Sequence, residues 1–512
     1  MELELKKHQF DTYEQGADLT LAHEETAETI VPDYCPDIAR IIATEGNVCI
    51  HSRDLREGRG TVSGTVRVTV LYVPEGESGI RTLGFSMPFT AESEGRLLSD
   101  CACFTVFTET ESLDTRMLNP RKVFTHCRLA LHLTGYRRVR LAVCSDAEAA
   151  PELRVEKRQE QQTAVLLTQI AEKDFTFTED MSLPSNRPGA AEILSSHITG
   201  TVTECKVVGS KLIFKGMFAV SILYRTQEQI CGFQCRELPF SQIMETDGVS
   251  EGASARVQLQ LTGSDIQIDG GDPEGRDLAV TLYVHATALL RQQQELTLLH
   301  DLYSTQHDLT YDAEPMTFTA FHDVQSRRQA VREVLEIGVE ADSILSVQAL
   351  CGPVSASAEG GGTVLRSFVT VRALYLDEGG TPLLAERTVE VSCPAEVSPE
   401  RRVSARAVCA GEIQSALTDR GIEVRFGVDF QMEESCQSKK LCISAVRMDT
   451  ETTKDSTGAP SLVLRQFGRE GSLWDLAKRY NTTISAILSA NQLEHESDVP
   501  AEKLLLIPRK RA

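Results

Sequence analysis

The sequence of 512 residues holds one tryptophan, Trp474, and lacks several features that mark common protein classes. It has no run of 18 consecutive apolar residues, so we expect no transmembrane helix. Its first residues, MELELKKHQFDTYEQG, have no apolar stretch after the charges, which argues against a secretory signal. We therefore expect a cytosolic chain whose 14 cysteines are mostly free thiols. The cysteines within apolar or β-branched runs, which we expect in the core, are Cys49, Cys127, Cys144, Cys205 and Cys442.

An excess of basic residues is also lacking, since 74 Asp and Glu outnumber 52 Lys and Arg, and known catalytic patterns are missing. The formal net charge of −22 argues against general nucleic-acid binding, because such binding needs a basic surface. The sequence contains no P-loop, dinucleotide-binding fingerprint, HExxH motif or nucleophile elbow. It also offers no paired acid and base and no activated nucleophile, so an unrecognised hydrolase is the weakest interpretation. We predict a protein that is not an enzyme and that binds no cofactor.

What the sequence does contain is a long internal repeat. Three predicted strands, at residues 64–72, 216–224 and 367–375, end in the dipeptide Leu-Tyr and alternate apolar with polar residues. Their tyrosines lie 152 and 151 residues apart. Two proline segments, PDYCP and PSNRP, are also 152 residues apart, whereas SRRQAVREVL takes this place in the third copy. A period near 150 is the size of a domain, so it indicates tandem homologous domains.

These landmarks predict the domain organisation and the fold class. Residues 1–150, 151–305 and 306–448 form repeats 1, 2 and 3, and the third is divergent. A polar linker at residues 449–461 leads to a small terminal unit at residues 462–509. Each repeat has later alternating segments after turn signals, so we predict mainly β, antiparallel, sandwich-like domains. We expect short helices at the entrance of each, such as Ile38–Ala43.

Three clusters have part of the pattern of a metal or redox site. Cys231 and Cys235 have the spacing of a zinc pair, but no second pair matches them. Cys101 and Cys103 fall on one side of a predicted strand, as a redox pair would, although structural thiols are the simpler interpretation. Carboxylates crowd residues 265–277 at a spacing that suits calcium, but a solvated hairpin turn is favoured there. We predict no metal site.

The terminal unit has the pattern strand, helix, helix, strand. Ser472 and Asp475 have the spacing of a capping box, and an apolar stripe at i, i+3, i+4 and i+7 follows. Thr483 caps a second predicted helix, for which Asn491 suits a left-handed C-terminal position. Trp474 lies off the apolar stripe, so we expect its ring to be partly exposed. LVLRQF and KLLLIP supply the two strands.

This unit resembles the LysM domain over residues 462–509. The matching residues are Leu473-Trp474, Leu476-Ala477, Arg479-Tyr480, Asn491, Leu493 and Leu505-Leu506-Ile507-Pro508. The turn departs from the family pattern, because Gly471 replaces the family's Asp and Ser472 its Thr. The resemblance implies a groove that binds N-acetylglucosamine chains in many LysM domains. The groove predicted for a protein partner or a glycan comprises Gly471, Ser472, Leu473, Trp474, Asn491, Gln492 and Leu493.

The body resembles tandem SPOCS domains, a family of endospore-forming bacteria. The resemblance rests on VPDYCPDIARII, on the VRVTVLY strand and on the Pro-Phe pair at residues 88–89. SPOCS repeats followed by one LysM domain are similar to SipL-type spore-morphogenesis proteins. This similarity implies a scaffold in the mother-cell cytoplasm that joins the ATPase of the coat basement layer, stage IV sporulation protein A, to the forespore surface. The alternative is a peptidoglycan- or N-acetylglucosamine-binding protein of the cell wall or cortex.

Overall fold

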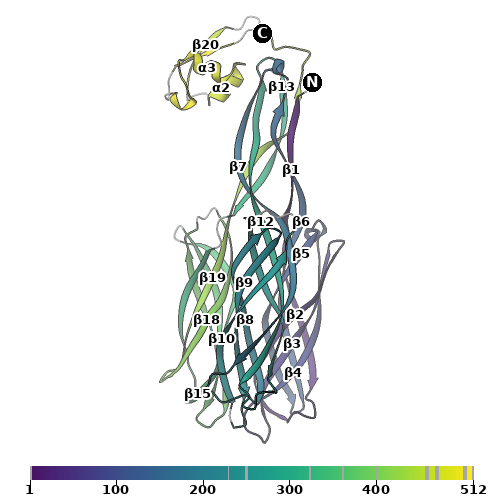
Figure 1. The fold of residues 1–512 in the computed structure, drawn as a ribbon, viewed down its shortest axis with the longest axis vertical. Helices are drawn as coiled ribbons and strands as arrows, with labels where there is room; N and C mark the ends of the chain where they lie inside the picture. Colours follow the sequence, from purple (N-terminus) through teal and green to yellow (C-terminus); the bar gives the residue numbers. More distant parts are fainter. Residues whose placement is uncertain are drawn as a thin grey trace.

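The computed structural model describes residues 3–228, 230–247, 252–321, 325–359, 362–397, 401–455, 460–467, 472–499 and 504–509. Almost all regular structure in these residues is antiparallel β, and the short helices lie mainly near the C-terminus. The predicted fold class, tandem β-rich units followed by a small βααβ unit, is therefore confirmed. In Figure 1 the strand bundles fill the lower part, long strands rise from them, and the helical unit lies at the top.

The first repeat packs two layers of strands around one core. One layer is a three-stranded sheet of order β2–β3–β4. The other layer, β1–β6–β5, is half of a six-stranded sheet that continues into the second repeat through the pairing of Tyr13 with Leu167. β-Branched residues at every second position of β3 favour a strand, and Val66 and Val68 share the core with Leu129 and Leu131 of β6. The elements are β1 (Glu4–Ile30), β2 (Ile38–Arg56), β3 (Arg59–Pro74), β4 (Arg81–Glu94), α1 (Arg96–Ser99), β5 (Cys103–Asn119) and β6 (Lys122–Glu148).

The second and third repeats have equivalent strands in the same order. A short 3-10 turn (Pro151–Leu153) precedes the second, whose strands are β7 (Val155–Ser182), β8 (Glu192–Val208), β9 (Lys211–Arg225), β10 (Ile230–Glu245), β11 (Ser254–Ile268) and β12 (Asp277–Ser304). The third has β13 (Leu309–Phe321), β14 (Gln325–Leu335), β15 (Ala341–Glu359), β16 (Gly362–Asp377), β17 (Pro382–Ala395), β18 (Arg402–Thr418) and β19 (Gly421–Met448). Here β13 and β14 both pair with β19, so together they replace one long first strand.

The repeated tyrosines occupy equivalent places, as the spacing predicted. Tyr72, Tyr224 and Tyr375 lie on β3, β9 and β16, the central strands of the three smaller sheets, and are at most 4% exposed. The Tyr224 hydroxyl donates to the Pro188 carbonyl oxygen at 2.9 Å, and Tyr72 donates to Pro36 at 3.3 Å. These bonds explain why two of the three repeats carry a proline segment at the same interval.

The predicted helix at Ile38–Ala43 is wrong, because these residues begin strand β2. Two β-bulges, between Ile38 and Arg40 and between Ile41 and Ala43, interrupt the alternation of the strand. Ile38 faces the core of the first repeat, whereas Ile42 faces a cluster shared by all three repeats. Because this segment buries apolar side chains on both of its faces, its apolar residues have the spacing of a helix rather than the alternation of a strand.

The shared cluster is built from equivalent residues of the three repeats. Its buried members are Ile42, Leu194 and Leu345, then Leu71, Leu223 and Leu374, together with Ile80. The last three leucines each precede a core tyrosine in the sequence. The Leu-Tyr dipeptide therefore places one side chain inside its own repeat and the next between the repeats, since successive side chains of a strand point to opposite faces.

The three sandwiches close into a ring around this cluster. Edge strand β4 contacts β8 of the second repeat, β10 contacts β15 of the third, and β17 contacts β2 of the first. A β-carbon at Gly232 of β10 would lie 1.4 Å from the Leu345 carbonyl oxygen, so only glycine fits there. At the third contact, Arg40 donates to the Pro382 carbonyl oxygen at 2.6 Å.

Beyond the ring, the long strands continue as a stalk (Figure 1). β12 has 28 residues and would span about 90 Å when extended. Side chains of β6, β7, β12, β13 and β19 form two further apolar clusters, so all three repeats contribute to the stalk. Below these clusters, buried Arg291 of β12 donates to Glu433 of β19, which also accepts from Arg256 at 3.0 Å. This ion pair holds the second and third repeats together where the stalk begins.

The tyrosine hydrogen bonds predict that removing the tyrosine hydroxyl destabilises the second repeat more than the third. Replacing Tyr224 by Phe leaves the Pro188 carbonyl without its partner and should lower the free energy of unfolding by about 1 kcal/mol. Tyr375→Phe is the matched control, because its hydroxyl has no hydrogen-bond partner within the described part of the chain. Urea unfolding followed by circular dichroism measures both; an equal loss in the two variants would contradict the assignment.

Candidate functional site

The terminal unit has the strand–helix–helix–strand order that the sequence predicted. It consists of β20 (Leu462–Gln466), α2 (Leu473–Arg479), α3 (Ile484–Ala490), a 3-10 turn (Glu496–Asp498) and β21 (Leu504–Pro508). The predicted apolar stripe of α2 is buried, and Ile487 of α3 and Leu505 and Ile507 of β21 complete its small core.

Both helix caps are confirmed. The Ser472 hydroxyl accepts the Asp475 backbone N–H, and the Asp475 carboxylate accepts the Ser472 N–H at 2.8 Å, which forms a capping box. The Thr483 hydroxyl accepts the Ala486 N–H at 3.1 Å at the start of α3. The Ser472 hydroxyl also donates to the Asp475 carboxylate at 2.7 Å, and this bond, together with the one from the Ser472 N–H, lowers the pKa of Asp475.

The left-handed position predicted for Asn491 is wrong. Asn491 has φ −103°, and the next residue, Gln492, has φ +57°. The Asn491 side chain instead links α3 to β21, since its amide donates to the carbonyl oxygens of Ile487 (2.8 Å) and Leu506 (2.7 Å). Its oxygen accepts the Leu506 N–H at 2.8 Å. Three hydrogen bonds make this residue a structural clamp.

The expectation of a partly exposed Trp474 ring is also wrong, because Trp474 is only 6% exposed. Its ring packs edge-on against Tyr303 near the end of β12, with 5.0 Å between the ring centres. The indole N–H donates to the Asp301 carboxylate at 2.7 Å. The Tyr303 hydroxyl in turn donates to the Thr482 carbonyl oxygen at 2.8 Å. We call these contacts, together with the ion pair between Lys478 and Asp301, the seat of the terminal unit.

Charge reinforces the seat. The Lys478 ammonium donates to the other oxygen of Asp301 at 2.6 Å, and the two side chains are partly shielded from solvent. Burial alone would raise the pKa of Asp301, but the hydrogen bonds from Lys478 and Trp474 outweigh it and lower that pKa. Asp301 is therefore charged at neutral pH and holds two donors of α2 at the tip of the stalk.

Six of the seven predicted groove residues lie in the described part of the chain, and they divide into two groups. Leu473, Trp474 and Asn491 are engaged within the unit or its seat. Gln492 is exposed, whereas Ser472 and Leu493 are half-buried. Gly471 lies outside the described residues. Gln492 is thus the most exposed of the six groove residues that the structure describes.

The two-stranded sheet of the unit also leaves one face uncovered. Val463, Leu505 and Ile507 point into the core, whereas Leu462, Leu464 and Leu504 are 52–64% exposed. The register pairs Leu464 with Leu506 and Gln466 with Leu504, so the exposed leucines share one face. We call Leu462, Leu464 and Leu504 the outward leucine face. An exposed apolar patch of this kind is typical of a contact surface.

The other candidate clusters do not form sites in the described residues. Residues 265–277 form the predicted hairpin turn, in which the Asp272 carboxylate accepts backbone N–H groups, and the structure brings together no three metal-ligating side chains among the residues it describes. The side chains of Cys231 and Cys235 lie outside the described set. Cys101 and Cys103 are free, as are the other described cysteines. Of the five expected in cores, Cys205 is only half-buried, and the rest are buried.

The residues that receive Trp474 were not among the predicted site residues. Asp301 and Tyr303 lie at the far end of β12, more than 20 residues after the strand begins at Asp277. The alternation of buried and exposed residues continues through Leu296 and Leu298, which was a usable signal for a longer strand. Nothing local, however, links Asp301 to a tryptophan 173 positions away.

The clamp formed by Asn491 predicts a large effect from a small change. Asn491→Ala removes three hydrogen bonds and should destabilise the terminal unit by about 2 kcal/mol. Ser489→Ala, on the exposed side of the same helix, is the control and should change little. The single tryptophan lies in this unit, so its fluorescence during urea unfolding of the full chain measures both variants. If Asn491→Ala leaves the urea midpoint of the Trp474 fluorescence transition unchanged, Asn491 does not act as a clamp.

The seat should weaken in acid. Because the folded-state pKa of Asp301 lies below its ordinary value of 3.8, its contribution to stability is complete above that pH and is lost as the pH falls through the lowered pKa. We expect Trp474 emission to stay constant from pH 7 to about 4.5 and to shift to longer wavelength below the ordinary pKa. Asp301→Asn should abolish this step, and circular dichroism checks that the body stays folded. Identical acid profiles for the two proteins would exclude Asp301 as the titrating group.

Family comparisons agree with this geometry. The family model described as SipL, SPOCS domain matches residues 37–117 and 189–269, which run from β2 to β5 and from β8 to β11. The LysM domain model matches residues 470–508. No curated protein matches the chain. No helix in the described residues is long and apolar enough to span a membrane.

SPOCS and LysM domains of this type are non-catalytic binding modules, and together they mark a sporulation-related adaptor with the potential to bind cell wall. The matched ranges leave out the long strands of the stalk, which the structure adds to each repeat. The chain carries two SPOCS domains of the SipL type and a C-terminal LysM domain, the SipL-like architecture that its sequence predicted.

Proposed function

We propose that this chain is a non-enzymatic scaffold of endospore coat assembly. It acts in the mother-cell cytoplasm, where it joins the ATPase of the coat basement layer, stage IV sporulation protein A, to the forespore surface. The LysM domain binds one of these two and the SPOCS repeats bind the other. The predicted units, at residues 1–150, 151–305, 306–448 and 462–509 with a linker at 449–461, serve as its working parts.

The observation that supports this proposal most is the position of the LysM domain. Trp474 and Lys478 fix it to Asp301 at the tip of the stalk, while the ring of sandwiches lies at the other end (Figure 1). A chain with binding modules at two separated ends suits a tether. The charge of the two parts also differs. Residues 463–512 hold eight Lys/Arg and six Asp/Glu, whereas the whole chain has a net charge of −22, so the repeats are acidic and the terminal unit is slightly basic.

We assign the contact with the ATPase to the groove of the LysM domain. Ser472, Gln492 and Leu493 face the partner, and Leu473, Trp474 and Asn491 support them from beneath. Gly471 replaces the acidic side chain of the family pattern, which removes a hydrogen-bonding group that a sugar would use. The outward leucine face lies on the same small unit and extends the apolar contact area that a protein partner buries.

The second candidate is binding of peptidoglycan or another N-acetylglucosamine-containing glycan, and the match of residues 470–508 to LysM favours it. A glycan binder would use the same groove but would need fixed polar partners for the sugar hydroxyls. The two functions therefore differ in ligand rather than in location.

Binding measurements on the full chain distinguish the two. We expect measurable affinity for the purified ATPase and weak or no affinity for chitin oligomers. Gln492→Ala should weaken ATPase binding about threefold to tenfold, since residues at the centre of a contact contribute most. Ser489→Ala, which is exposed elsewhere on the unit, is the matched control.

Circular dichroism verifies that the repeats stay folded in each variant. Tight binding of chitin oligomers without binding of the ATPase would overturn the proposal and establish the glycan function instead. Loss of binding in both Gln492→Ala and Ser489→Ala would remove the groove from the assignment.

A further inference from the structure

Two thiols of the third repeat lie in direct contact. The sulfur atoms of Cys351 and Cys409 are 3.1 Å apart, and both cysteines are free. Cys351 is on β15 and Cys409 on β18, the edge strands of the two opposing sheets of the sandwich. A disulfide needs sulfur atoms about 2.05 Å apart, so a movement of roughly 1 Å would complete the bond.

The second repeat has no thiol pair at the equivalent positions. Cys351 lies opposite Val369 in its sheet, as Gly200 lies opposite Phe218 in the second repeat. Cys409 lies opposite Val428, as Leu261 lies opposite Val284. The equivalent residues of the second repeat, Gly200 and Leu261, cannot cross-link. The thiol pair is therefore an addition to the sandwich of the third repeat and not a requirement of its fold.

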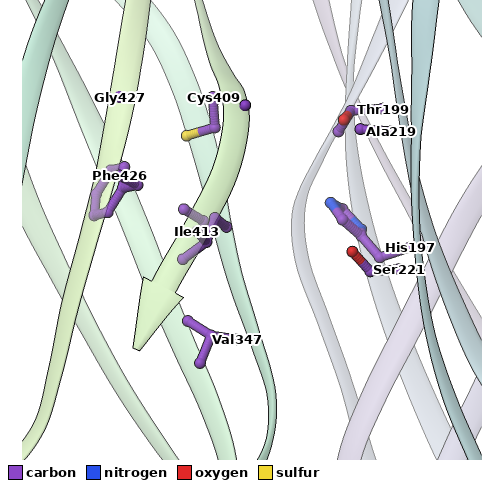
Figure 2. A pocket seen from close by; sticks show the side chains of 11 residues that line it. His197, Thr199, Ala219, Ser221, Val347, Cys409, Ile413, Phe426 and Gly427 are labelled. Carbon is purple, nitrogen blue, oxygen red and sulfur yellow. The ribbon is translucent and has the colours of Figure 1, made fainter. Parts of the chain in front are cut away.

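A small molecule can approach the Cys409 side of the pair, 3.1 Å from the sulfur atom of Cys351. Cys409 lines a cavity of about 40 Å³ between the second and third repeats, with His197 and Ser221 on one wall and Ile413 and Phe426 on the other (Figure 2). A cavity of roughly 15 Å³ already holds one water molecule, so this one has room for a hydroperoxide of similar size.

The local chemistry favours one of the two thiols as the nucleophile. The hydrogen bond from Cys409 lowers the pKa of Cys351, and the positive charge of Arg406 acts in the same direction. The same contact raises the pKa of Cys409, so the shared proton stays there. Thiolates react with hydroperoxides much faster than thiols do.

We propose that Cys351 and Cys409 form an oxidation site, which hydrogen peroxide converts into a disulfide that joins the two sheets of the third repeat. The Cys351 thiolate attacks the peroxide oxygen, and the O–O bond breaks to leave a sulfenic acid and one water. The Cys409 sulfur then attacks the Cys351 sulfur and displaces the second water. The two thiols lose two electrons and two protons in total, and the peroxide is reduced to two waters.

The cross-link changes the mechanics of one repeat only. It ties β15 to β18 on the side of the sandwich that faces the second repeat, where β10 contacts both strands. A disulfide between strands of opposite sheets prevents them from separating, which stabilises the folded state relative to the unfolded chain. Oxidation would thus hold the two sheets of the third repeat together, independently of what the LysM domain binds.

Thiol counting and peptide mapping of the full chain test this site. We expect hydrogen peroxide to remove two of the 14 thiols from titration under denaturing conditions and dithiothreitol to restore them. Mass spectrometry should find the peptides of Cys351 and Cys409 joined, at the summed mass less two hydrogens. Cys409→Ser should stop the cross-link and leave a sulfenic acid on Cys351 that dimedone traps.

Cys205→Ser is the control, because Cys205 is a half-buried thiol of the second repeat and should not affect the cross-link. The wild-type measurement stands even if a variant fails to fold. The proposal is overturned if both Cys351 and Cys409 can still be alkylated after peroxide treatment. It is also overturned if either cysteine forms a disulfide with a different partner.

Discussion

The fold depends on a strand that is buried on both faces at one end. In each repeat the core tyrosine points into its own sandwich, and the leucine before it points into the cluster shared by three repeats. A shift of the strand register by one residue would exchange its two faces. The tyrosine would then lie between the repeats, and the leucine would lie in the core of its own repeat, where it cannot form the tyrosine's hydrogen bond. The dipeptide thereby fixes the register within each repeat and the packing between them at once.

Ring closure has consequences at the far end of the molecule. Because the three sandwiches are held around one cluster, their long strands run together and bury two further clusters as a stalk. The buried pair of Arg291 and Glu433 ties the second and third repeats where the stalk begins. At the tip, Asp301 receives the indole and the ammonium of α2. The position of the LysM domain is therefore a product of packing that starts in the ring.

The three repeats share an architecture without sharing every contact. The first two use a proline segment to receive the tyrosine hydroxyl, and the family model matches both of them. The third has no proline segment, splits its first strand in two and carries the contact between Cys351 and Cys409 instead. Such divergence on a common frame suits an adaptor whose parts serve different partners, since the frame is kept by the shared cluster and the surfaces are free to change.

Features that depend on near neighbours in the chain could be predicted from the sequence. The alternation of the strands, the caps at Ser472 and Thr483 and the LysM motif were all predicted, because each rests on residues a few positions apart. Tertiary structure alone decided the rest. Ile38–Ala43 is a strand because both of its faces find apolar partners in distant segments. Asn491 became a clamp, and Trp474 was buried, because β21 and the end of β12 supply their hydrogen-bond partners. Contacts of this kind arise only when folding brings remote strands together, and no local pattern encodes them.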